Sequence, residues 1–205
     1  MGEAEGVSRM QPVDCVLLAA GRSSRTTQWK MLLPCGRATV LEASVEAALA
    51  VCARALVVAG FRADELTRLF RGRERVQVIV NPQYEEGMFS SVRRGAAAVG
   101  TPRFFLALGD MPLVSPQTYR VLLAAPEAEA VIPKYRGKKG HPLLLSDGVA
   151  RAVAAAPSGA GLRDVLAAVA TLLVPVEDPH VLQDIDTDED YRALLADPRA
   201  GRERV

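Results

Sequence analysis

The chain has 205 residues, of which 49% are hydrophobic and 24% are charged, and its 25 basic and 24 acidic side chains leave a formal net charge of +1. This apolar content and small net charge exclude an intrinsically disordered chain, and they give no support for a protein that coats nucleic acid. No apolar run approaches the ~20 residues of a membrane-spanning helix, so we expect a globular chain without a membrane partner.

The length fits a single domain, with polar ends at about residues 1–11 and 197–205 that we expect to be flexible. The N-terminus has no signal-peptide pattern, and the three cysteines form no CxxC pair. Both features favour the cytoplasm, with free thiols and neither a disulfide nor a zinc framework.

Short apolar runs alternate with longer amphipathic patterns along the chain. Alternation at intervals of about 20–25 residues predicts a mostly parallel sheet covered by helices on both faces, which is a three-layer α/β/α arrangement. In chain order we expect strand Cys15–Ala20, helix 39–53, strand Ala55–Ala59, helix Ala63–Phe70, strand Val76–Val80, helix Ser90–Val99, strand Phe104–Leu108, helix Pro116–Ala124, strand Ala130–Pro133, strand Leu143–Leu145, helix Asp147–Ala155, helix Leu162–Ala168, strand Leu172–Val174 and helix Glu189–Leu195.

The loop after the first strand is rich in groups that bind phosphate. Gly21 lets the backbone approach a ligand, and it is followed by Arg22, Ser23, Ser24, Arg25 and Lys30. Residues 15–41 carry four basic side chains and no acidic one. Because ligands bind at the carboxyl ends of the strands in such sheets, this pattern favours a phosphate site. The loop matches neither a Walker A motif nor a dinucleotide fingerprint, and a solvated basic loop is the alternative.

Carboxylates stand in two places where they could hold a metal ion. Asp110 follows the fourth strand at the same edge, and Mg²⁺ beside a nucleoside triphosphate takes one or two such ligands. A turn or capping role is the alternative for Asp110. Residues 177–190 carry seven acidic residues and no Lys or Arg. In an extended segment Asp184 and Asp186 share one face, so one of them is a candidate second ligand, whereas Thr187 and Asp190 resemble a helix N-cap.

Two further segments carry candidate binding groups. Asn81 follows the third strand, and Ser90 and Ser91 open the next helix, where they could simply cap it. Residues 130–146 carry four basic side chains and no acid, which suggests a second anion-facing edge or a solvated loop. His141 lies in this segment, with a turn or packing role as its alternative.

Taken in this order, the segments resemble the molybdenum cofactor cytidylyltransferases, a branch of the MobA-like nucleotidyltransferases with a Rossmann-like GT-A fold. The likeness covers about residues 13–195, and its joint order and spacing are what make it specific. The matching segments are 18–25 (LAAGRSSR), 28–34 (QWKMLLP), 81–82 (NP), 87–92 (GMFSSV), 108–114 (LGDMPLV), 140–142 (GHP) and 184–191 (DIDTDEDY).

The resemblance implies transfer of CMP from CTP to the molybdopterin cofactor, with release of pyrophosphate and with Mg²⁺ as the metal. It implies catalytic roles for Arg25, Lys30 and Asp110, and Asp110 and Asp186 as metal ligands. Gly140 and His141 are the candidates for binding the acceptor substrate. The implied nucleotide-binding residues are Ala19, Ala20, Gly21, Arg22, Ser23, Ser24, Arg25, Lys30, Asn81, Ser90, Ser91 and Asp110.

Two features bear on the choice of substrate. Residues 19–21 are Ala-Ala-Gly, where the guanylyltransferases have Ala-Gly-Gly, and this favours CTP. Thr26 and Thr27 stand where the family usually has Met-Gly. If the glycine conformation is required, threonine would strain or displace the loop, and otherwise the threonine hydroxyls could donate to phosphate.

These features leave two alternative functions open. One is a related nucleotidyltransferase that uses GTP or another phosphorylated acceptor. The other is a non-catalytic accessory protein that binds the molybdenum cofactor and hands it to a molybdenum enzyme. The expected partners are CTP or another nucleoside triphosphate, the molybdopterin cofactor and a molybdenum hydroxylase apoenzyme, with no nucleic acid.

Overall fold

The structure is a computed structural model that describes residues 12–23 and 26–200. Its main sheet has eight strands in the order β10-β7-β9-β6-β1-β4-β5, with β8 paired to β7, and a separate two-stranded sheet joins β2 and β3. The strands are β1 (Asp14–Ala19), β2 (Pro34–Cys35), β3 (Ala38–Thr39), β4 (Arg54–Ala59), β5 (Val76–Val80), β6 (Arg103–Leu108), β7 (Ala130–Tyr135), β8 (Lys138–Lys139), β9 (Leu143–Ser146) and β10 (Thr171–Pro175). The helices are α1 (Val40–Leu49), α2 (Ala63–Leu69), α3 (Met88–Ala96), α4 (Pro116–Ala124), α5 (Asp147–Ala155), α6 (Leu162–Ala167) and α7 (Asp188–Ala196), with 3₁₀ turns η1 (Lys30–Leu32), η2 (Tyr84–Glu86) and η3 (Pro179–Leu182).

The sheet is mostly parallel, as the sequence predicts. β1 lies between β4 and β6 and pairs in parallel with both, so that Leu17 is opposite Val57 on one side and Ala107 on the other. β9 runs antiparallel between β6 and β7. Every residue of β1 is buried, which explains why the part after Asp14 is a continuous apolar run rather than an alternating one.

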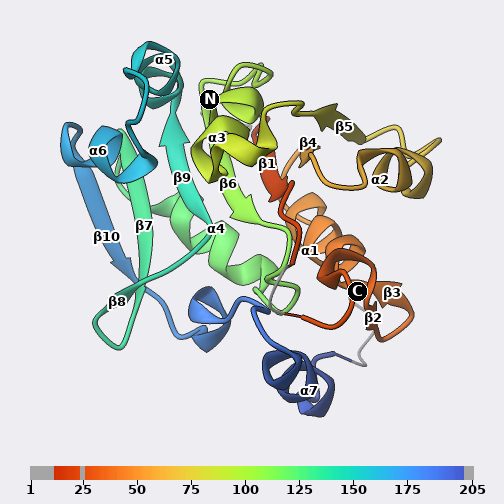
Figure 1. Cartoon of the computed structure of the whole chain (residues 1–205). Helices are drawn as coiled ribbons and strands as arrows, with labels where there is room; N and C mark the ends of the chain where they lie inside the picture. Colours follow the sequence, from red (N-terminus) through yellow and green to blue (C-terminus); the bar gives the residue numbers. More distant parts are fainter. Residues whose placement is uncertain (1–11, 24–25, 201–205) are drawn as a thin grey trace, which may run out of the picture.

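Helices cover both faces of the sheet, which confirms the three-layer α/β/α arrangement (Figure 1). Cys15 and Leu17 of β1 face a core built with α1, α2 and α4. Val16 and Leu18 face the other core, built with α3, α5 and α6. This division follows from the alternation of side chains along a strand.

The structure corrects the expected start of one helix. α3 begins at Met88 after Gly87, whose φ of 103° suits a glycine. Ser90 and Ser91 therefore lie inside the helix, and the prediction that they cap it is wrong. The two-residue strands β2, β3 and β8 were not predicted, because so short a segment shows no periodicity.

The last described residues lie against the rest of the chain, and the flexible end expected from residue 197 stays a prediction. Ala200 is buried in a third apolar cluster with Leu33, Ile185 and Leu194. In Figure 1 the helix α7 lies at the bottom of the view, below the sheet. The capping box predicted at Thr187 and Asp190 is confirmed. The C-terminal segment is thus packed against the loops at one end of the sheet.

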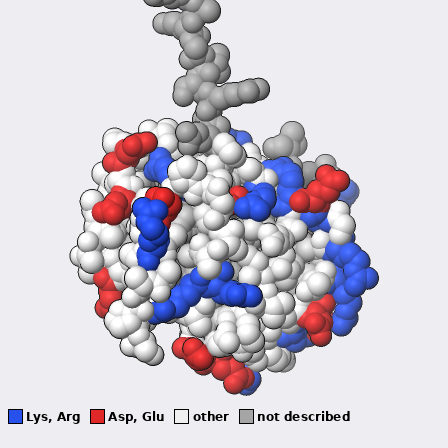
Figure 2. Space-filling model, turned by 90° about the horizontal axis from the view of Figure 1, so that it is seen from above, with Lys and Arg blue, Asp and Glu red and all other residues white. Residues whose placement is uncertain are grey.

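The end of the molecule opposite α7 carries a mixture of charges. Figure 2 views the molecule from above, away from α7, and shows basic and acidic side chains interspersed over this face. The three cysteines are free and buried. Within the described ranges, no helix is both long enough and apolar enough to cross a membrane.

Candidate functional site

Three carboxylates converge beyond the carboxyl end of β6. Asp110 follows that strand, and Asp184 and Asp186 come from the segment that leads into α7. One oxygen from each carboxylate lies within 4.8 Å of the others. The Ile185 N–H donates to the Asp110 carbonyl at 3.2 Å, which fixes the C-terminal segment against the turn that carries Asp110. Three hard oxygen ligands at this spacing fit a divalent cation.

Gly109 explains how the turn before Asp110 packs so closely. A Cβ atom at this position would lie 2.8 Å from Leu41 Cδ1 and 3.0 Å from the Leu18 carbonyl oxygen. The Ser44 hydroxyl of α1 donates to the Gly109 carbonyl at 2.9 Å. The absence of a side chain therefore lets the turn lie directly on β1 and α1, which holds Asp110 in place.

Lys30 enters the same cluster from the start of η1. Its Nζ atom lies 2.5 Å from Asp110 Oδ2 and 3.2 Å from Asp186 Oδ1. Burial alone would lower the pKa of Lys30, but the two carboxylates outweigh it and raise that pKa. Burial raises the pKa of Asp110, and the neighbouring Asp184 adds to this, so that Lys30 only partly offsets the increase. Burial is the largest cause, so the pKa of Asp110 stays above its ordinary value although Lys30 lies beside it.

The first loop lies beside this cluster. Ala19 and Ala20 are buried at the end of β1, and the Trp29 indole N–H donates to the Gly21 carbonyl at 3.0 Å. The Lys30 backbone N–H donates to the Ser23 hydroxyl at 3.4 Å. Arg22 forms an exposed ion pair with Glu85. The predicted ligands Ser24 and Arg25 lie outside the described residues.

The two threonines that replace the family's Met-Gly have ordinary backbone angles. Among the non-glycine residues that the structure describes, positive φ occurs at Ser23, Arg62 and Arg136. Neither Thr26 nor Thr27 is in this group, so the strain considered for these positions is not observed. Their hydroxyls donate within the protein, Thr26 to the Ser23 carbonyl and Thr27 to Asp188.

Asn81 forms a buried cluster with the two serines of α3. Its side-chain amide donates to Ser90 Oγ at 2.9 Å and to Ser91 Oγ at 3.0 Å, and its carbonyl oxygen accepts from the Gln83 N–H. Asn81 is only 1% exposed. Its side chain thus fixes the loop before α3. Contact of these residues with a nucleotide stays a prediction.

His141 and Gly140 lie against η3, near the acidic cluster. A Cβ atom on Gly140 would lie 2.2 Å from the Val181 carbonyl oxygen, and the His141 N–H donates to that same oxygen at 2.9 Å. Burial lowers the pKa of His141, which makes the ring neutral near pH 7, although Asp110 and Asp184 partly oppose this. His141 Nδ1 is buried and makes no hydrogen bond to any described residue, so it is a polar atom still without a partner.

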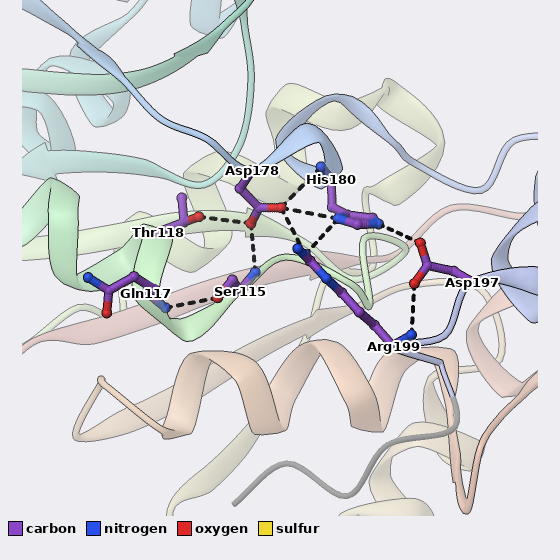
Figure 3. A network of polar contacts seen from close by, with 7 residues as sticks. All are labelled: Ser115, Gln117, Thr118, Asp178, His180, Asp197 and Arg199. Carbon is purple, nitrogen blue, oxygen red and sulfur yellow. Dashed lines mark hydrogen bonds and ion pairs between the residues drawn. The ribbon is translucent and has the colours of Figure 1, made fainter.

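A second polar network was missed from the sequence (Figure 3). The His180 ring lies between two carboxylates, with Nδ1 3.1 Å from Asp178 Oδ1 and Nε2 3.0 Å from Asp197 Oδ2. Asp178 also accepts from the Thr118 hydroxyl at 2.8 Å and from Arg199 at 3.2 Å. The partners come from segments up to 63 residues apart, so no local pattern could reveal them. The network ties η3 to the start of α4 and thereby supports the segment that carries Asp184 and Asp186.

Two hollows are present on the described surface. One of about 430 Å³ is lined by Asp184, Asp186 and His180 and adjoins the acidic cluster. A larger one of about 740 Å³ lies by the β2–β3 hairpin and contains none of the predicted site residues. Of the two, the smaller hollow is the one that touches the acidic cluster, through Asp184 and Asp186, whereas Asp110 and Lys30 are not among its lining residues.

Known proteins resemble this chain both in sequence and in fold. Residues 15–173 match the family model of the MobA-like NTP transferase domain. The molybdenum cofactor cytidylyltransferase of Escherichia coli is 34% identical over 89% of this chain and 95% of its own length. The nicotine blue oxidoreductase of Paenarthrobacter nicotinovorans is 32% identical over 88% of this chain and 95% of its own length. A Mycobacterium tuberculosis protein, solved in complex with manganese, superposes with a TM-score of 0.73 at 28% identity. The match covers 91% of this chain and 98% of that protein.

Proposed function

The chain belongs to the MobA-like NTP transferase family and is a nucleotidyltransferase, and from this premise we propose that it transfers CMP from CTP to the molybdopterin form of the molybdenum cofactor. The observation that carries the proposal is the convergence of Asp110, Asp184, Asp186 and Lys30 at the carboxyl edge of the sheet, next to the first loop. A cluster of this kind suits a triphosphate with its metal ion. The Ala-Ala-Gly sequence at the end of β1 supports the cytidine preference.

In the proposed reaction, a terminal phosphate oxygen of the cofactor attacks the α-phosphorus of CTP. The new P–O bond forms as the bond between the α-phosphorus and the bridging oxygen breaks, and pyrophosphate leaves with that oxygen. The acceptor phosphate is already ionised, so no side chain has to remove a proton. Catalysis then consists of positioning and of neutralising charge.

Asp110 and Asp186, with Asp184 beside them, are the residues that would hold a divalent cation, which we propose to be Mg²⁺. The cation, when bound, neutralises charge on the phosphates. Lys30 is held between Asp110 and Asp186 in this structure, within reach of the first loop. We expect its ammonium group to turn to the triphosphate, together with Arg25.

His141 and Gly140 are proposed to face the acceptor. The support is the unpartnered Nδ1 atom of His141, whose neutral ring can hydrogen-bond a ligand without adding charge. Gly140 contributes by letting this segment lie against Val181. A molybdenum hydroxylase apoenzyme remains the proposed recipient of the product.

The test is a panel of CTP, GTP, UTP and ATP, each with and without the molybdopterin cofactor, in which pyrophosphate release is measured. We expect release from CTP that depends on the cofactor and on a divalent cation. Pyrophosphate release from GTP, and from none of the other three nucleotides, would identify GTP as the substrate in place of CTP. Cofactor binding without turnover of any nucleotide would instead favour the accessory-protein function.

The likeness to nicotine blue oxidoreductase calls for one more arm in the same experiment. The protein is mixed with a reduced nicotinamide cofactor and a quinoid dye, and the absorbance of the nicotinamide is followed. We expect no oxidation above the enzyme-free rate. Sustained oxidation together with no pyrophosphate release would contradict the proposed function.

A further inference from the structure

Three contacts hold the segment around the start of α7 against the chain that follows the first loop. Tyr191 Oη donates to the Pro34 carbonyl at 2.9 Å, and Lys30 Nζ lies 3.2 Å from Asp186 Oδ1. The third contact joins Thr27 to Asp188, residues that are 161 positions apart in the chain. The Lys30 contact involves a predicted phosphate ligand directly, and the Thr27 contact adjoins the first loop that carries the others.

The contact between Thr27 and Asp188 uses both oxygens of the carboxylate. The Thr27 backbone N–H donates to Oδ1 at 3.1 Å, and the Thr27 hydroxyl donates to Oδ2. The carboxylate thus accepts from both the amide and the hydroxyl of a single residue. Hydrogen bonds to a charged acceptor are stronger than neutral ones.

The helix itself does not need Asp188 for its cap. Thr187 is the N-cap, and Asp190 Oδ2 accepts from the Thr187 N–H at 2.7 Å. Glu189, in the same first turn, is directed to solvent, with a side chain that is 84% exposed and an ion pair to Arg192 of 3.9 Å. Asp188 is thus the acidic residue of this turn that reaches the loop, and Glu189 is a matched control for it.

Thr26 and Thr27 stabilise the loop in different ways. The Thr26 hydroxyl lies 3.0 Å from the Ser23 carbonyl oxygen and 2.6 Å from the Gln28 carbonyl oxygen, so its single proton is donated within the turn. Thr27 fastens the same turn to α7. The replacement of Met-Gly therefore supplies a hydroxyl that glycine lacks, and the structure gives that hydroxyl a partner.

We propose that Asp188 is a positioning residue for nucleotide binding, which holds the first loop at Thr27 and joins it to the segment that carries Asp184 and Asp186. The choice of nucleotide as the ligand rests on the proposed function. A loop that is already ordered loses less conformational freedom when a triphosphate binds. Loss of the contact should therefore raise the KM for CTP more than it lowers kcat.

The kinetic test compares Asp188→Ala with Glu189→Gln. We expect Asp188→Ala to raise the KM for CTP about 10-fold with kcat within about twofold, because the cost falls on ordering the loop. Glu189→Gln, which removes a charge from the same turn, should leave both constants unchanged. An unchanged KM in Asp188→Ala, or an equal rise in Glu189→Gln, would overturn the proposal.

Variants of Thr27 test whether the hydroxyl acts through Asp188. Thr27→Val should raise the KM, whereas Thr27→Ser should stay close to the unmodified protein because it keeps the hydroxyl. The double variant Thr27→Val with Asp188→Ala should be no worse than Asp188→Ala alone, since both remove one interaction. Additive effects would contradict a shared interaction.

Hydrogen exchange gives a readout that needs no turnover. The Thr27 amide should exchange about 10-fold faster in Asp188→Ala than in the unmodified protein or in Glu189→Gln, because its acceptor is gone. Equal exchange rates in all three proteins would show that Asp188 does not hold the Thr27 amide, and this would overturn the proposal. If the unmodified protein releases no pyrophosphate from CTP, the proposed function fails. The exchange rate of the Thr27 amide still decides whether Asp188 holds the loop at Thr27.

Discussion

Asp110 and Asp178 are two buried carboxylates whose pKa values shift in opposite directions. Their exposed fractions are 8% and 6%, so their solvent exposure is nearly the same. Burial raises the pKa of Asp110, and Lys30 does not cancel the increase. Burial also acts on Asp178, but hydrogen bonds from His180, Ser115 and Thr118 hold its pKa well below the usual range. The difference lies in the deeper burial of Asp110 among protein atoms and in the larger number of donors around Asp178.

This contrast indicates different roles for the two carboxylates: Asp110 belongs to the candidate site, and Asp178 stabilises the fold around it. Asp178 accepts from two backbone amides, the Thr118 hydroxyl and the Arg199 guanidinium, and it lies 3.1 Å from His180 Nδ1, so the protein itself supplies many partners for its charge. Asp110 shares the ammonium of Lys30 with Asp186 and also faces the like charge of Asp184. A buried carboxylate left short of positive charge is suited to a cation from outside.

The largest expected effect is on turnover, from Asp110→Asn. The substitution keeps the shape of the side chain and removes a charge that would hold the metal ion. Loss of one such electrostatic contact typically costs 10²–10³-fold in rate, about 3–4 kcal/mol. We expect kcat to fall by at least this factor while the melting temperature does not drop. Near-normal turnover with Mg²⁺ present would contradict the metal-ligand role.

Asp178→Ala should show the reverse pattern, with stability as the main loss. It leaves His180 and Arg199 without their shared carboxylate, and breaking a buried pair of this kind costs about 3–5 kcal/mol. For a chain of this size, the melting temperature should fall by about 10 °C. Glu177→Gln, at the exposed neighbouring position, serves as the control. An unchanged melting temperature would mean that the network is not a scaffold.

Lys30→Ala should change both turnover and the affinity for the divalent cation. We expect kcat to fall about 100-fold, because a cation near the transferred phosphate is lost. Affinity for the divalent cation should rise, since the ammonium no longer competes for Asp110 and Asp186. Turnover at saturating CTP and a metal titration followed by calorimetry measure the two effects. An unchanged rate would argue against a role in the transition state.

The smallest expected effect is a pH dependence of stability that originates at His180. Its pKa is raised by Asp178 in the first place and further by Asp197, against opposition from burial and from Arg199. The stabilisation is therefore complete below the ordinary histidine pKa of about 6.5 and is lost as the pH rises through the raised value. The lowered pKa of Asp178 gives the opposite limb, with stability that is present above the ordinary carboxyl pKa of about 3.9 and is lost progressively as the pH falls below it. Melting temperatures of the protein and of His180→Gln between about pH 5 and 9 test this, and parallel curves would contradict it.

The sequence was sufficient for the sheet and for the acidic cluster, and the reasons are physical. Buried parallel strands leave continuous apolar runs such as Cys15–Ala20, and the carboxyl ends of such strands meet at one edge, which brought Asp110 near the first loop. Alternation placed Asp184 and Asp186 on one face. The Asp178 network could not be found in this way, because its members meet only through tertiary packing. The same limit applies to Ala200, whose burial depends on α1 and α7.

We propose that the carboxylate cluster of Asp110, Asp184 and Asp186 serves the transfer of CMP to the molybdopterin cofactor. The most direct measurement is mass spectrometry of the product formed from CTP and the cofactor by the unmodified protein and by Asp110→Asn, with pyrophosphate measured in parallel. We predict a cytidylylated cofactor and pyrophosphate in equal amounts from the unmodified protein, and neither from Asp110→Asn. Equal yields from both proteins, or a product without the cytidylyl group, would contradict the claim.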